Sequence, residues 1–125
     1  MRIPVSSSKP VSTILITSGY TQHLNDQLFK AVKQNDVSRA ELTIDRGADV
    51  NARDKFKRTP LIIAAFRGYT KLANSLISKG ANIGAMDING KTPILAAGTQ
   101  GHSDIVALLI TKGASKWAPP QYIEE

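Results

Sequence analysis

The stretch GADVNARD, at residues 47–54, returns 33 residues later as GANIGAMD, at residues 80–87. After a second interval of 33 residues the chain reads GASKWAPP, at residues 113–120. A sequence that resembles itself at a fixed period of about 20–50 residues is typical of a repeat architecture. The 33-residue unit therefore sets the frame in which the rest of the chain is interpreted.

The two complete periods align without any insertion. Residues 54–86 match residues 87–119 at the following positions: Asp54 with Asp87, Thr59-Pro60 with Thr92-Pro93, Ala64 with Ala97, Gly68 with Gly101, Leu76-Ile77 with Leu109-Ile110, and Lys79-Gly80-Ala81 with Lys112-Gly113-Ala114. One period earlier, Leu28, Ala31, Ile44 and Gly47-Ala48 fall on the same frame. The period predicts three units, at residues 21–53, 54–86 and 87–118, with an extension at 1–20 and a tail at 119–125.

Each unit is expected to begin with a short helix. Thr59 and Thr92 precede a proline, and threonine is a good N-cap while proline suits the first helical position. Asp26, followed by Gln27, holds the same place in the first unit and is expected to cap in the same way. The small residues at 64–65 and 97–98 let this helix approach its neighbour closely.

A second helix follows in each unit. Apolar residues at 72, 73, 76 and 77, and again at 105, 106, 109 and 110, have the spacing of one helical face. Gly68 and Gly101 end the first helix, and the glycine of each Gly-Ala pair ends the second one, because glycine adopts a positive φ without steric cost.

A unit with TPL, AA, G, L and GA in this order resembles the ankyrin repeat. The segments RTPLIIAAFRGYTKLANSLISKGANI (58–83) and KTPILAAGTQGHSDIVALLITKGAS (91–115) carry most of that pattern, and the resemblance covers residues 21–118. It implies an all-α ankyrin-repeat solenoid of stacked helix-turn-helix units with short hairpin-like turns. The departures from the family pattern are Ile62 and Leu95 in place of its histidine, Lys57 in place of the hairpin glycine seen as Gly90, and Gly84 and Trp117 in place of the loop asparagine seen as Asn51.

No catalytic or metal-binding pattern accompanies the repeat. The chain has no cysteine and two histidines. His23 has no Cys or acidic neighbour at ligand spacing, and the resemblance places His102 at the inter-helix turn, a structural position. Asp54 and Asp87 recur at hairpin starts, where aspartate favours turns by accepting hydrogen bonds from the backbone. We therefore expect no enzyme activity, no metal and no cofactor.

The resemblance implies that the chain binds another protein through the hairpin tips and the exposed side of the first helices, which form a concave face. Transferred to this sequence, that face comprises Lys33, Arg53, Lys55, Phe56, Arg58, Phe66, Arg67, Ile88, Lys91 and Gln100. Phe56 and Phe66 are expected to be exposed among basic residues, and aromatic and arginine side chains are enriched at interface hot spots. The alternative for Phe56 is packing within its own hairpin.

The net charge of +6 and a pI near 9.8 favour an acidic protein surface as the partner. The stretch RDKFKR, at residues 53–58, also suits a basic nucleic-acid-binding accessory protein. Aspartates interspersed through the units make that the second hypothesis, because phosphate binding requires an array of Lys and Arg. A solvated basic face without a specific partner is the third.

The two ends of the chain differ from the repeats. The β-branched residues of VSTILITSGY (11–20) are typical of a short strand. We expect this segment to lie against the first unit, and the alternatives are disorder and strand pairing with a partner. The last unit is apolar nearly all round at residues 104–111, so its cover is either the tail with Trp117, Tyr122 and Ile123, a second copy, or a partner. PPQY (119–122) also fits a WW-domain ligand.

A monomer or a weak homodimer through the last repeat is therefore expected. No apolar run approaches the roughly 18 residues of a membrane span, and the N-terminus is a poor signal peptide. The expected location is the cytoplasm, although a secreted or periplasmic protein whose leader had been removed would look the same.

Overall fold

The computed structural model describes the backbone of residues 11–113 and the side chains of residues 19–113. This part of the chain holds six helices and no strand: α1 (Val11–Lys33), α2 (Val37–Asp45), α3 (Pro60–Arg67), α4 (Thr70–Ser78), α5 (Pro93–Thr99) and α6 (Ser103–Lys112). The prediction of an all-α repeat fold is confirmed.

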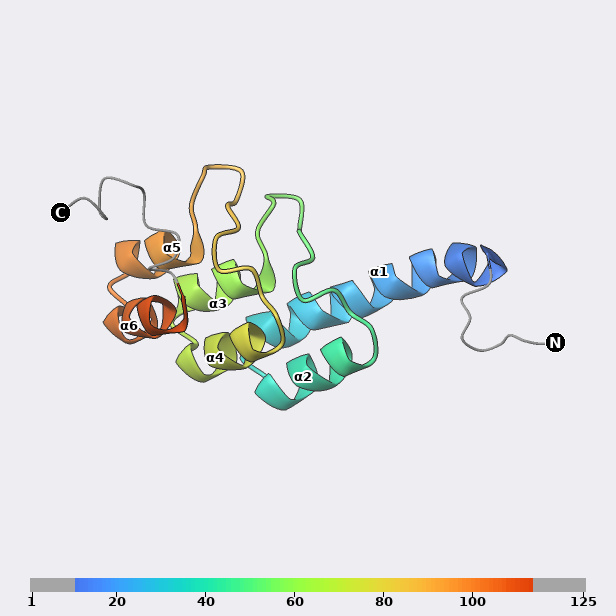
Figure 1. The fold of residues 1–125 in the computed structure, drawn as a ribbon, viewed down its shortest axis with the longest axis horizontal. Helices are drawn as coiled ribbons and strands as arrows, with labels where there is room; N and C mark the ends of the chain where they lie inside the picture. Colours follow the sequence, from blue (N-terminus) through green and yellow to red (C-terminus); the bar gives the residue numbers. More distant parts are fainter. Residues whose placement is uncertain (1–10, 114–125) are drawn as a thin grey trace.

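The helices form two layers (Figure 1). Helices α1, α3 and α5 lie side by side in one layer, and α2, α4 and α6 form the other, so that each successive pair supplies one helix to each layer. The loops that follow α2 and α4 project past the first layer as long hairpin-like connections. Residues 1–10 and 114–125 lie outside the described residues, and so do the proposed cover by Trp117, Tyr122 and Ile123 and the PPQY motif.

The predicted helix signals act as expected in the second and third units. The Thr59 hydroxyl accepts a hydrogen bond from the backbone N–H of Ile62 (3.2 Å), and Thr92 accepts one from Leu95 (3.3 Å). The glycines of the three Gly-Ala pairs have φ values of 121°, 100° and 138°. The recurring Gly-Ala pair is therefore the exit from each helix pair, as predicted.

The first unit begins differently from the prediction. Residues 11–20 belong to α1 and form no strand, and Asp26 lies inside α1, where its carboxylate accepts a hydrogen bond from the side chain of Gln22 (3.0 Å). Among the described side chains of this helix, Leu24 and Leu28 are both buried, on either side of Asp26. The apolar spacing thus carries the helix past the apparent cap, and β-branched residues lower helix propensity only by tenths of a kcal/mol.

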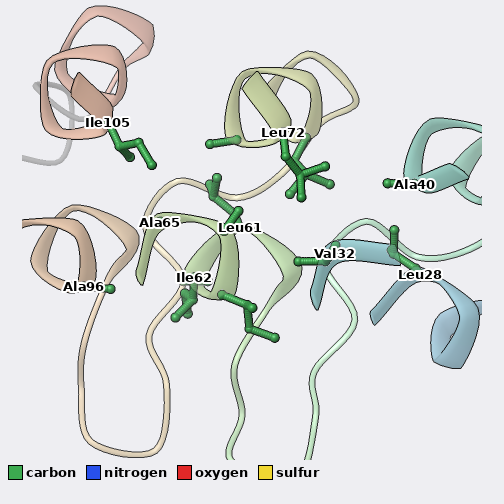
Figure 2. Close-up of a cluster of buried hydrophobic side chains, with 14 of the residues drawn as sticks. Leu28, Val32, Ala40, Leu61, Ile62, Ala65, Leu72, Ala96 and Ile105 are labelled. Carbon is green, nitrogen blue, oxygen red and sulfur yellow. The ribbon is translucent and has the colours of Figure 1, made fainter. Parts of the chain in front are cut away.

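The core lies between the layers and centres on the second unit (Figure 2). Its largest fully buried aliphatic side chains are Leu28, Val32, Leu61, Ile62, Leu72, Leu76, Ile105 and Leu109. Ala64, Ala65 and Ala97 are fully buried and allow the close helix packing that was predicted. Gly98 is exposed with open space beside it, so the same prediction is wrong for that residue.

The hairpins are built on one aspartate each. Asp54 accepts hydrogen bonds from the backbone N–H groups of Phe56 and Arg58 through one carboxylate oxygen (both 2.9 Å). Asp87 accepts the equivalent bonds from Asn89 and Lys91 at 2.8 and 2.9 Å. The structural role predicted for both aspartates agrees with this geometry.

The missing hairpin glycine does not change the second hairpin. Lys57 has a φ of 61°, close to the 81° of Gly90 at the equivalent position. A non-glycine residue in this region costs roughly 1–2 kcal/mol. The hairpin tolerates that cost because Asp54 stabilises the turn with several hydrogen bonds. Its backbone N–H donates to the carbonyl of Arg58, its carbonyl accepts from the N–H of Lys57, and its carboxylate accepts from the two backbone N–H groups named above.

Adjacent hairpins are also bound to each other. The backbone N–H of Ile88 donates to the carbonyl of Phe56 (2.9 Å), and the Arg53 guanidinium donates to the carbonyl of Met86 (2.7 Å). At the base of the hairpins, Asn51 accepts from the backbone N–H of Asn82 (2.6 Å). These contacts fix the hairpins of units two and three relative to each other.

His102 joins the second and third units at the opposite edge. Its Nε2 donates to the carbonyl of Phe66 (3.0 Å), since a carbonyl oxygen can only accept. The ring lies so close to Gly68 that an added Cβ there would stand 2.7 Å from it. Gly68 also has a φ of 79°, so two separate constraints require glycine at this position.

We predict that Gly68→Ala destabilises the protein more than Gly101→Ala. Both changes place alanine at a positive φ, at a cost of roughly 1–2 kcal/mol. At Gly68 the His102 ring must also move and lose its hydrogen bond, which adds about 1 kcal/mol, whereas nothing lies within 4 Å at Gly101. Urea unfolding followed by circular dichroism measures the difference. In a His102→Ala background the two costs should become equal, and a persistent gap would contradict the explanation.

The second prediction concerns the pKa of Asp54. Burial works to raise this pKa, but hydrogen bonds from the backbone and side chain of Arg58 and the backbone of Phe56 outweigh it, so the pKa lies below its ordinary value of 3.8. A depressed folded-state pKa contributes stability that is present above the unfolded pKa and is lost as the pH falls through the folded pKa.

The free energy of unfolding of the wild type should therefore fall below about pH 4 more steeply than that of Asp54→Asn. At neutral pH the variant should be less stable by about 1 kcal/mol, because asparagine keeps an acceptor but loses the charge. Denaturant unfolding at a series of pH values gives both slopes. Equal slopes in the two proteins would show that Asp54 does not hold the hairpin through its charge.

Candidate functional site

Two neighbouring hollows lie on the side of the molecule where the hairpins project. The first hollow, of about 710 Å³, lies between α1 and the second unit's hairpin and is lined by Gln22, Asn25, Asp26, Phe29, Lys30, Lys33, Gln34, Arg53, Asp54, Lys55, Phe56 and Arg58. The second hollow, of about 330 Å³, lies between the hairpins of units two and three and is lined by Phe56, Arg58, Ile62, Ile63, Phe66, Arg67, Asp87, Ile88, Asn89, Lys91 and Ala96. We call the two hollows together the hairpin face.

The structure brings nine of the ten sequence-predicted site residues to the hairpin face. The first hollow holds Lys33, Arg53 and Lys55, the second holds Phe66, Arg67, Ile88 and Lys91, and Phe56 and Arg58 form the wall between them. Gln100 is exposed at the end of α5 and lines neither hollow. No further unit follows the third within residues 11–113, so no neighbouring hairpin faces Gln100 there.

Phe56 and Phe66 keep large exposed areas on this face. Phe56 is 46% exposed and Phe66 is 44% exposed. The Phe56 ring also lies within cation–π distance of its own hairpin, with the Lys55 ammonium 5.4 Å and the Arg58 guanidinium 5.0 Å from the ring centroid. Each of the two expectations for Phe56 is therefore partly met. The ring packs against its own hairpin, and about half of its surface is still exposed to solvent.

The arginines of the face have structural contacts as well as charge. Arg58 pairs with the Asp54 carboxylate at 2.9 Å, and Arg67 donates to the carbonyl of Lys33 at 3.3 Å, which ties α3 to α1. Within the described residues the ammonium groups of Lys33 and Lys91 make no ion pair. The charge that remains available to a partner thus comes mainly from lysines.

Several lining residues were missed from the sequence. The floor of the second hollow is made by Ile62, Ile63 and Ala96, of which the two isoleucines lie one helical turn before Phe66 on α3. Phe29 and Lys30 stand exactly one period before Ile62 and Ile63 and line the first hollow. The repeat frame carried the signal that identifies them.

The described residues show no other recognisable chemistry. In residues 11–113 no group of three His, Cys, Asp or Glu side chains is placed to hold a metal ion. None of the helices there combines enough length with enough apolar character to span a membrane. The hairpin face is the candidate functional site, because it gathers nine of the ten predicted site residues.

Comparisons with known proteins agree with the repeat frame. The chain is 44% identical over 45 residues, 36% of its length, to the ankyrin repeat protein FPV244 of fowlpox virus (strain NVSL), and covers 7% of that relative. A family model for ankyrin repeats in three copies matches residues 28–119. Because that match spans most of the chain and the helix pairs follow the same period, the chain belongs to the ankyrin-repeat family.

Proposed function

We propose that the chain is a non-catalytic protein-binding module that holds an acidic partner surface on its hairpin face. Ankyrin repeats generally mediate protein–protein interaction, which supports the class of function. The observation that carries the choice of surface is the pair of half-exposed aromatic rings, Phe56 and Phe66, on neighbouring hollows. Exposed aromatic residues beside arginines are the usual composition of interface hot spots.

The rigidity of the face favours binding. The hairpin of unit two is stabilised by the hydrogen bonds to the Asp54 carboxylate. The Phe56–Ile88 and Arg53–Met86 hydrogen bonds join it to the hairpin of unit three. Binding to a surface that is already ordered loses little conformational entropy, so more of the contact energy is available for affinity.

The charges of the face favour an acidic partner. Five cationic side chains line the first hollow against two carboxylates, and one of those carboxylates, Asp54, is engaged by Arg58 and the hairpin backbone. Three cationic side chains line the second hollow against Asp87, which is occupied by its own turn. Complementary charge of this kind speeds association more than it raises affinity.

The proposal has three further parts. Ankyrin repeats are typically non-catalytic, which supports a module that performs no catalysis. Leu95 and Ile110 are about half exposed at the last unit, which suits a monomer or a weak homodimer through that end. The cytoplasmic location remains the expectation drawn from the sequence.

The test is capture of a partner from a lysate of the source organism, with the wild type beside the double variant Phe56→Ala/Phe66→Ala. Removing two hot-spot aromatics should weaken binding by at least 2 kcal/mol, or roughly 30-fold. Because both rings are half exposed, the variant should stay folded, which circular dichroism checks. Mass spectrometry identifies the protein that the wild type alone retains.

Leu42→Ala is the matched control, because Leu42 is 50% exposed on α2, in the other layer. That variant should capture the partner as well as the wild type does. Equal recovery by the double variant would remove the binding site from the hairpin face. Material that disappears after nuclease treatment and whose affinity falls linearly with the logarithm of salt concentration would favour the nucleic-acid alternative instead.

A further inference from the structure

We infer that the partner presents a single continuous segment with two parts: a run of carboxylates that lies in the first hollow, and one apolar side chain beside it that enters the second. This inference rests on the proposed function and specifies the chemistry of the partner at that site. It follows from the aliphatic side chains that line the second hollow, from the different volumes of the two hollows, and from the three lysines on the first hollow against one on the second.

The second hollow has an apolar floor. Ile62 and Ile63 are each 2% exposed and Ala96 is 1% exposed, so the floor is continuous with the protein core. Phe66 and Ile88, 44% and 59% exposed, stand beside it. A side chain that enters here contacts this floor and covers apolar surface that belongs mainly to Phe66 and Ile88. Each square ångström of that surface removed from water contributes about 25 cal/mol.

The volume of the second hollow limits its occupant. About 330 Å³ is at the lower end of the range of roughly 300–1,000 Å³ that is usual for ligand sites. This space suits one side chain of the size of leucine, methionine or phenylalanine, and it does not admit a whole helix. The occupant is therefore a residue that projects from a segment passing over the hollow.

The first hollow differs in both size and charge. Its volume of about 710 Å³ is more than twice that of the second, which leaves room for several carboxylates with bridging water. Lys30, Lys33 and Lys55 are exposed on its lining, and within residues 11–113 none of them forms an ion pair. Of the two carboxylates on the lining, Asp26 accepts from Gln22 and Asp54 is paired with Arg58.

The two hollows share one wall. Phe56 and Arg58 line both, and the Arg58 guanidinium lies 5.0 Å from the Phe56 ring centroid and 2.9 Å from Asp54. This wall belongs to the hairpin of unit two, where the backbone N–H of Phe56 donates to the Asp54 carboxylate and the carbonyl of Phe56 accepts from the N–H of Ile88. A segment that crosses the wall places its carboxylates on one side and its apolar residue on the other, so both parts belong to one stretch of partner chain.

Synthetic peptides test this inference with the whole chain of residues 1–125. One set carries a run of glutamates and one leucine in a Gly/Ser background, in both orders and with varied separation between them. In a second set leucine is replaced by serine, and in a third glutamate is replaced by glutamine. Fluorescence anisotropy should show that the best two-part peptide binds at least about tenfold more tightly than either single-part counterpart.

Variants of the protein assign each preference to a hollow. Phe66→Ala/Ile88→Ala should remove the tenfold preference for leucine and keep that for glutamate. Lys30→Gln/Lys33→Gln/Lys55→Gln should do the reverse and reduce the salt dependence. Lys71→Gln, at an exposed lysine on α4, is the charge control and should change neither preference.

Two results would overturn the inference. One is equal binding of two-part and acidic-only peptides at every separation and in both orders. The other is the absence of peptide binding by a protein that still captures a partner in a Phe56- and Phe66-dependent way, since that partner would use a folded surface. In both cases the proposed function would stand, because its own failure is the loss of Phe dependence in the capture experiment.

Discussion

The burial of α3 between its two neighbours is the interaction on which the rest of the structure depends. A repeat unit can bury its apolar face only against adjacent units. In α3 the six residues from Pro60 to Ala65 are all buried, whereas in α5 only Pro93, Ala96 and Ala97 are. The second unit is therefore the centre of a three-unit core, and its two junctions determine where the hairpins and the hairpin face can form.

Each of the two hollows of the hairpin face lies at a junction between units. The first hollow forms where α1 meets the hairpin of unit two. The second hollow forms where the hairpin of unit two meets the hairpin of unit three. Gln100 occupies the repeat position of Arg67 but lies beyond the last junction of the described residues, so no facing hairpin completes a hollow around it. The position of a residue within the repeat thus indicates whether its side chain is exposed. Whether that side chain lines a hollow depends on the presence of a neighbouring unit.

The features that could be predicted from the sequence are those governed by local backbone rules. Thr-Pro caps and Gly-Ala exits need only a few consecutive residues, and they recur twice or more in register. The start of α1 was missed because Asp26-Gln27 imitates a cap, while the packing of Leu24 against the core carries the helix through it. The first inter-helix turn was missed because Asn35, with a φ of 56°, replaces the glycine of the later units.

The exposed residues of the hairpin face could be predicted from the sequence, whereas the buried residues that form the floor of its second hollow were missed. Lys33, Phe56 and Phe66 were found because the family pattern marks positions that point outward. Ile62 and Ile63 are buried, and they also form the bottom of a hollow that exists only after two units have stacked. A buried residue that also lines a surface hollow cannot be recognised from hydrophobicity alone, because the same side chain satisfies both descriptions.

The contacts of the two aromatic rings make them unequal as reporters of binding. The Phe56 ring lies beside Lys55 and Arg58, and Arg58 in turn pairs with the carboxylate that holds the hairpin. Removing that ring therefore alters the positions of two cations as well as the apolar surface. The Phe66 ring is not within cation–π distance of any side chain in the described part of the chain, and its backbone carbonyl keeps the bond from His102 after truncation to alanine. A loss of affinity in Phe66→Ala consequently measures apolar contact with the partner, whereas the additional loss on truncating Phe56 includes the rearrangement of the basic wall.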